Sequence, residues 1–151
     1  MARYFWRAWP LCGALDLGYA ILITMVMGGT AKAVLLSVAS GPFGDGVADW
    51  GALALLLGVL VHFAIMAMMV AAYAPLSRTQ IVLRMGPWLA GILWGLALYL
   101  VMYWIILPLR FPAVHPITEP ARIARALFPH LALVGIPMAL IARQTLSGAR
   151  S

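Results

Sequence analysis

The sequence predicts an all-α fold: an integral membrane four-helix bundle with a short interfacial helix after the first span. Hydrophobic residues make up 65% of the 151 residues and charged residues only 9%, whereas soluble domains carry about 25% charged residues. Four apolar stretches are long enough to cross a bilayer, at about residues 11–28, 51–73, 88–108 and 122–142. A chain of this length leaves no room for a soluble module, so we expect one membrane domain over residues 1–151.

The first span is expected to end at Gly28-Gly29, because two glycines disfavour helix and permit positive φ. Thr30 is then the expected N-cap of a short helix over about residues 31–39, which Gly41-Pro42 closes. Its apolar residues share one face, a pattern typical of a helix that lies on the membrane surface. One long tilted span over residues 11–39 is the alternative.

The second span is the clearest, because residues 51–73 contain no Asp, Glu, Lys or Arg. As a helix this stretch reaches about 34 Å, enough for a hydrocarbon core of about 30 Å. The third span follows Gly86-Pro87, and Pro108 is expected to end it.

The fourth helix is expected to begin near Pro120, with Thr118 as its N-cap. Pro137 lies inside this helix, where the missing amide predicts a bend. His115, in the proline-rich stretch that precedes the helix, is expected to be solvated.

The formal net charge of +6 arises from residues at the ends of the apolar segments. Lipid head groups and orientation signals explain such positions, so we expect the bilayer and no nucleic acid as partner. Four spans place both termini on one side, and six basic residues against four then predict that both termini are cytoplasmic. The two sets are Arg3, Arg7, Arg78, Arg84, Arg143 and Arg150 against Lys32, Arg110, Arg122 and Arg125.

Several short segments, spread over nearly the whole chain, recur together in one family. They are ALDLG (14–18), VASGPFG (38–44), LVHF (60–63), VMYW (101–104), LPL (107–109), PHL (129–131) and VGIP (134–137). On these segments the chain resembles the YagU-like family of small uncharacterised bacterial inner-membrane proteins. The resemblance implies four helices and a bacterial inner-membrane location, but it implies no mechanism.

Ionisable groups inside a membrane cost a few kcal/mol, so Asp16 and His62 are candidate functional residues. The two lie within about 5 Å in depth, so a hydrogen bond between their helices is feasible, and Tyr19 is one turn from Asp16. Such a cluster either anchors a ligand, relays protons or holds two helices in register.

His62 and His130 also suggest a tetrapyrrole. Their depths differ by roughly 9 Å, which disfavours a haem held by both, although a single imidazole can ligate a chlorophyll-type pigment. His62, Met66 and Met69 share one helix face, which suits Cu(I) but also describes ordinary core packing. Core packing is the expectation, with no metal and no other cofactor.

Small residues at i and i+4 occur twice, as Gly91 with Gly95 and as Ala67 with Ala71. In lipid such pairs let helix backbones approach closely, within the bundle or against another subunit. The chain contains no HExxH, GxSxG, P-loop or CxxC motif, and its four acids leave few candidates for acid–base work, so we do not expect an enzyme.

Two functions follow from this pattern. The first is a non-catalytic subunit or assembly factor that packs against a larger respiratory or photosynthetic membrane complex through aromatic residues near its N-terminus. The second is a binding protein for a small molecule, pigment or haem, or a proton-coupled transporter, that uses the Asp16–His62 cluster with Tyr19 and His130.

Overall fold

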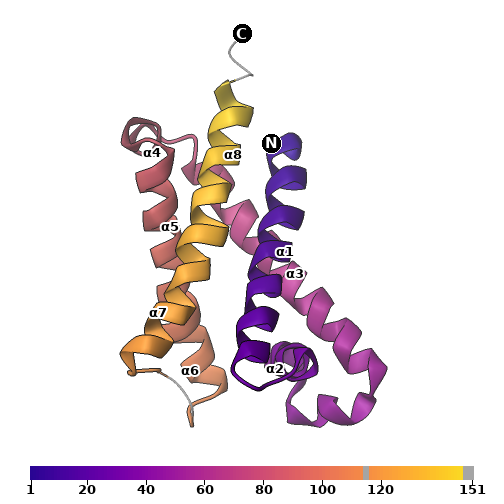
Figure 1. Ribbon diagram of the computed structural model, residues 1–151. Helices are drawn as coiled ribbons and strands as arrows, with labels where there is room; N and C mark the ends of the chain where they lie inside the picture. Colours follow the sequence, from indigo (N-terminus) through magenta and orange to yellow (C-terminus); the bar gives the residue numbers. More distant parts are fainter. Residues whose placement is uncertain (114–115, 148–151) are drawn as a thin grey trace.

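The structure, a computed structural model, describes residues 1–113 and 116–147. Within these residues four helices are long and apolar enough to cross a membrane: Ala2–Val26, Ala52–Leu76, Pro87–Arg110 and Pro120–Thr145. The start of α1 (Ala2–Val26) and the end of α8 (Ile136–Ser147) lie at the same end of the bundle (Figure 1). The predicted all-α four-helix architecture is confirmed. His115 and Arg150 lie outside the described residues.

The first span begins about nine residues before the expected start at residue 11, because the segment before it also finds a place in the core. Tyr4 and Ala8 are buried in the main hydrophobic cluster, and the Tyr4 hydroxyl donates to the carbonyl of Val70, 3.4 Å away. Pro10 lies inside the helix. Burial of the aromatic face therefore outweighs the hydrogen bond that this proline removes.

The chain breaks after α1 as expected, and the alternative of one long tilted span is wrong. Gly28 has a φ of 86°, a conformation that favours glycine. The hydroxyl of Thr30 then accepts a hydrogen bond from the amide of Ala33 and caps α2 (Ala31–Phe43).

The expected end of α2 at residue 39 is wrong, because the helix continues through Pro42 to Phe43. It ends at Gly44, whose φ is 80°. α2 packs against α3 (Ala52–Leu76) and α1 at the end of the bundle opposite the start of α1 (Figure 1). Gly58 of α3 permits this approach, since a Cβ there would collide with the backbone of Leu35.

Arg110 holds the end of α2 in place. Its Nε and Nη2 atoms donate to the carbonyl of Ser40 at 3.1 and 2.8 Å, and Nε also donates to the carbonyl of Gly41 at 3.0 Å. These carbonyls belong to the last turn of α2, where that of Ser40 also accepts from the amide of Gly44 at 3.0 Å. Nη2 also lies 2.8 Å from the Asp45 carboxylate, in a short 3₁₀ helix, η1 (Asp45–Trp50).

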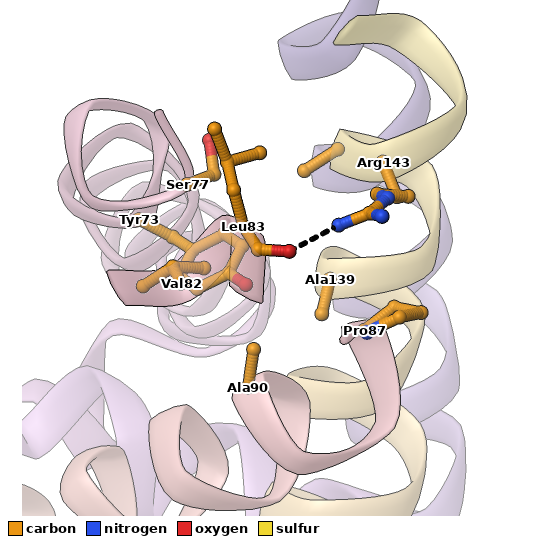
Figure 2. A pocket seen from close by; sticks show the side chains of 9 residues that line it. Tyr73, Ser77, Val82, Leu83, Pro87, Ala90, Ala139 and Arg143 are labelled. Atoms are coloured by element: carbon orange, nitrogen blue, oxygen red, sulfur yellow. Dashed lines mark hydrogen bonds between the residues drawn. The ribbon is translucent and has the colours of Figure 1, made fainter. Parts of the chain in front are cut away.

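The second and third spans are joined by α4 (Gln80–Met85), which Arg143 of α8 fastens to the fourth span. Its Nη1 atom donates to the carbonyl of Leu83 at 2.7 Å, and Figure 2 shows this bond beside Tyr73, Ser77 and Pro87. The cavity at this point is only about 10 Å³, room for about one water molecule.

The third span runs as one helix through α5 (Pro87–Val101), the π-helical η2 (Met102–Ile106) and α6 (Leu107–Arg110). Pro108 does not end it, contrary to expectation: the wide turns of η2 come directly before this proline, an irregularity typical of helices that continue past a proline. The helix ends two residues later at Arg110.

The fourth span consists of α7 (Pro120–Phe128), the π-helical η3 (Pro129–Gly135) and α8. Its N-cap position is Glu119 and carries no side-chain cap, so the expected Thr118 cap is wrong. The irregularity expected at Pro137 lies mainly before it, in the wide turns of η3.

Glycines bring the third and fourth spans into backbone contact. A Cβ on Gly91 would lie 2.6 Å from Cα of Ile136, and one on Gly95 would collide with the carbonyl of His130. Gly91 and Gly95 therefore pack within the bundle. Ala71 is exposed and Ala67 only partly buried, so this second pair does not form a comparable contact between the described helices.

Candidate functional site

The main cavity of the described structure has a volume of about 840 Å³ and lies at the end of the bundle where α2 packs. Its walls come from α1, α2, Tyr103 of η2, and the α7 and η3 segments of the fourth span. Apolar side chains cover much of the wall: Ala20, Ile23, Met27, Ala33, Val34, Val38 and Ile117. Against this background the polar groups form two separate sets.

The inner set comprises Asp16, Tyr19, Tyr103 and His130. Asp16 interacts electrostatically with both Tyr103 and His130, so α1 and the last two spans contribute to one cluster. The ring of Tyr103 lies 5.6 Å from that of His130 and stacks on Tyr99 at 5.1 Å. Of the residues proposed from sequence, the fold thus brings Asp16, Tyr19 and His130 together.

Two of these side chains have their donors committed to the backbone of α7. The Tyr19 hydroxyl donates to the carbonyl of Arg125 at 3.2 Å, and Nδ1 of His130 lies 2.9 Å from the carbonyl of Ala126. A carbonyl only accepts, so Nδ1 carries the hydrogen, and in the neutral ring Nε2 holds a lone pair. The neighbouring carbonyls of Arg125 and Ala126 thus orient both side chains.

The outer set lies on and beside the first turns of α7. Arg122, Arg125 and Glu119 line the cavity there, and Nη2 of Arg125 lies 3.8 Å from Oε2 of Glu119. Arg122 is exposed and forms no ion pair with another described residue. Eight helical residues separate Arg122 from His130, which corresponds to about 12 Å in depth.

His62 does not line the cavity, although it lies beside Asp16. Its Nε2 atom is 4.0 Å from Oδ2 of Asp16 but only 3.0 Å from the carbonyl oxygen of Gly13. The expected Asp16–His62 hydrogen bond is therefore replaced by a bond from the imidazole to the backbone of α1. A carbonyl at hydrogen-bond distance takes the donor before a carboxylate 1 Å farther away.

The two methionines considered as copper ligands are used in packing. Met66 is buried in the main hydrophobic cluster, and Met69 packs against it. No group of three or more His, Cys, Asp or Glu side chains in residues 1–113 and 116–147 is arranged to hold a metal ion. For a tetrapyrrole, His130 lines the cavity with Nδ1 bonded to the carbonyl of Ala126, whereas the Nε2 atom of His62 is occupied by Gly13.

The sequence analysis did not identify four of the lining residues as site residues: Tyr103, Glu119, Arg122 and Arg125. The sequence feature that could have identified the two arginines is the strongly amphipathic segment Pro120–Phe128. It carries its charged residues on one face, at the start of a membrane-spanning helix. Tyr103 gave no such signal, because an aromatic residue near a membrane interface is ordinary.

Comparison with models of protein families, with curated proteins and with solved structures finds no match. The four long apolar helices nevertheless define the class: this is a multi-pass membrane protein whose helices contact the lipid bilayer.

Proposed function

We propose that this protein binds a small amphipathic molecule in the cavity between α1, α2 and the fourth span. The observation that carries the proposal is the cavity of about 840 Å³ in which Asp16, Tyr19 and His130 converge on one apolar wall. Ligand sites in proteins are concave, largely apolar and about 300–1,000 Å³ in volume, with few polar groups that fix orientation. The cavity has a volume in this range and an apolar wall beside its polar groups.

Packing against a larger respiratory or photosynthetic complex, the other function considered from sequence, has less support. It rested on aromatic residues and on close-packing glycines that were free to meet another subunit. Tyr4 is buried, Nε1 of Trp9 donates to the carbonyl of Phe63, and Gly91 with Gly95 packs against the fourth span. These groups serve contacts within the chain, whereas Trp6, 64% exposed, is the N-terminal aromatic that remains open to another subunit.

Proton-coupled transport is the second candidate, and the position of Asp16 favours it. The carboxylate lies between the cavity on one side and His62 on the other. A buried apolar cluster that includes Ala8, Cys12 and Met138 fills the bundle beyond it. Flux of a bound molecule in liposomes, driven by an imposed pH gradient and abolished in Asp16→Asn, would support transport over binding alone.

The remaining expectations stand as proposals of the same kind. They are membership of the YagU-like family, a bacterial inner-membrane location, cytoplasmic termini and a non-catalytic role. Three segments on which the family resemblance rests contribute Asp16, Tyr103 and His130 to the cavity, which supports a shared site in that family. No described lysine or acid lies at the end with the start of α1, where Arg3, Arg7, Arg78, Arg84 and Arg143 gather.

The test fills the cavity and asks whether a bound molecule is lost. Ala20→Trp places a large ring in the cavity, whereas Ala14→Trp places the same ring on the exposed face of the same helix. Each protein is purified in mild detergent, and its small molecules are extracted and compared by mass spectrometry. We expect a species present in the unmodified protein and in Ala14→Trp but depleted in Ala20→Trp. Identical extracts from all three would count against binding in this cavity.

A further inference from the structure

We infer that the cavity takes an amphipathic amine, bound with its ammonium group at the inner end beside Asp16. The inference rests on the proposed binding function and specifies the ligand's chemistry. Four observations lead to it: the hydrogen-bonding character of the inner end, its charge, its aromatic rings and the contrast with the mouth of the cavity.

Three of the four polar side chains at the inner end, those of Asp16, Tyr19 and His130, present acceptors. An ionised Asp16 carboxylate only accepts hydrogen bonds. The Tyr19 hydroxyl gives its hydrogen to the carbonyl of Arg125, so its oxygen lone pairs remain. Nδ1 of His130 is bound to the carbonyl of Ala126, so the neutral ring offers the lone pair of Nε2. An ammonium group, with up to three donors and no acceptor, is complementary to these three atoms.

The negative charge of Asp16 also favours a positively charged ligand at the inner end. Asp16 forms no ion pair with a described arginine or lysine, and its basic neighbour is His62, at 4.0 Å, whose Nε2 is already bonded to Gly13. An intramembrane carboxylate costs a few kcal/mol unless it is paired. A ligand cation at this position supplies the missing positive charge.

The rings of Tyr19 and Tyr103 line the same part of the cavity. Aromatic faces attract cations and are tolerant of the alkyl groups attached to an amine. The apolar wall formed by residues such as Ile23, Val34 and Val38 then accommodates the hydrocarbon part of the molecule.

The mouth has the opposite character. Arg122 presents donors about 12 Å from His130 along the fourth span, and Arg125, about 7.5 Å from His130, is partly neutralised by Glu119. An anionic amphiphile would therefore stay at the mouth with its head group on Arg122. A cationic donor finds three acceptors at the inner end and an anion finds the arginines at the mouth, and this difference makes the two ligand classes separable by experiment.

The experiment compares octylamine, octanol and octanoate, which share one chain length and differ in head-group charge. Binding is measured by calorimetry on the purified full-length protein in dodecyl maltoside, with empty micelles as the blank. We expect octylamine to bind about tenfold or more tightly than the other two, because hydrogen bonds to a charged group are the stronger ones. Equal binding of octanol, or tighter binding of octanoate, would overturn the inference.

Variants assign the selectivity to Asp16. Asp16→Asn keeps the shape and removes the charge, so the preference for octylamine should fall to within about twofold, whereas Asp16→Glu should retain it. Asp49→Asn, an exposed acid outside the cavity, is the matched control and should change nothing. A preference that survives in well-folded Asp16→Asn contradicts the inference. The comparison of the three probes on the unmodified chain does not depend on any variant folding.

The outcomes also separate this inference from the proposed function. If octanol or octanoate binds best and Ala20→Trp blocks it, the cavity is a binding site but not for amines. If no probe binds and Ala20→Trp loses no bound molecule, both proposals fail. Nanodiscs then identify the source of the amine: phosphatidylethanolamine that competes with octylamine points to a lipid head group, and absence of competition points to a free amine.

Discussion

His62 of α3 is joined to Gly13 of α1 by a bond of 3.0 Å between its Nε2 atom and the glycine carbonyl oxygen. Two further side-chain-to-backbone bonds link the same helices, from Nε1 of Trp9 to the carbonyl of Phe63 at 2.8 Å and from the hydroxyl of Tyr4 to that of Val70. The second span is thus attached to the first by side chains from both helices that bond to the opposite backbone. Asp16 remains available to the cavity.

We expect His62→Leu to lower the free energy of unfolding by about 0.6 kcal/mol, the average for a polar contact between membrane helices. His62→Gln keeps a donor of similar reach and should lose less. Unfolding in mixed micelles of rising dodecyl sulfate content, followed by circular dichroism, measures both. Equal losses in the two variants would indicate that the imidazole ring contributes by packing on Phe63 and not by its donor.

Gly95→Ala should destabilise the bundle by about 1–3 kcal/mol, the usual cost of overpacking a well-filled core. The added Cβ would meet the carbonyl carbon of His130 at 2.8 Å, and backbone cannot move aside as a flexible side chain can. Gly18→Ala is the matched control, because nothing lies within 4 Å of its Cβ. The same dodecyl sulfate titration should show Gly18→Ala at least as stable as the unmodified protein. A tolerated Gly95→Ala would show that α5 does not contact η3 this closely.

Boundaries set by local chemistry were predictable from the sequence. The break between α1 and α2 follows from Gly28, which adopts a positive φ, and from the cap that Thr30 provides. Both features depend only on residues close in sequence. Boundaries that depend on distant residues were not. The helix that starts at Ala2 is stabilised where Tyr4 meets Val70, and α2 reaches Phe43 where Arg110 binds its last turn.

The sequence predicted which polar residues belong to the candidate site, but not which partner each side chain bonds. A histidine and an aspartate in apolar helices stand out in any sequence, and Asp16 and His130 do line the cavity. The partner of His62 could not be foreseen, because every helical residue offers a carbonyl and only the fold determines which one lies opposite. The cavity itself arises from the placement of α2, which depends on Gly58 and Arg110.

Arg110→Met should loosen α2, which forms one wall of the cavity. Three hydrogen bonds from Arg110 reach the carbonyls of Ser40 and Gly41, so their loss leaves the last turn of α2 held at Ser40 by the amide of Gly44 alone. Hydrogen exchange followed by mass spectrometry should show faster exchange over residues 31–43. Asp45→Asn should have little effect, because the side chain of Asp45 is 85% exposed and exposed ion pairs contribute about 0–1 kcal/mol. Faster exchange in Asp45→Asn but not in Arg110→Met would show that Asp45, and not the bonds from Arg110 to the backbone, holds α2 in place.

The cavity should admit water-soluble reagents from the side of the membrane where α2 lies. In a Cys12→Ala background, which removes the lone buried thiol, Thr24→Cys places a thiol on the cavity wall and Leu22→Cys places one on the 63%-exposed lipid-facing side of the same helix. A membrane-impermeant methanethiosulfonate needs a hydrated thiolate, so it should modify Thr24→Cys and spare Leu22→Cys. With cytoplasmic termini, modification occurs in right-side-out vesicles and requires permeabilisation in inverted ones. The reverse pattern would place both termini outside, and equal modification of the two thiols would mean that the cavity is no more accessible to water than the lipid face.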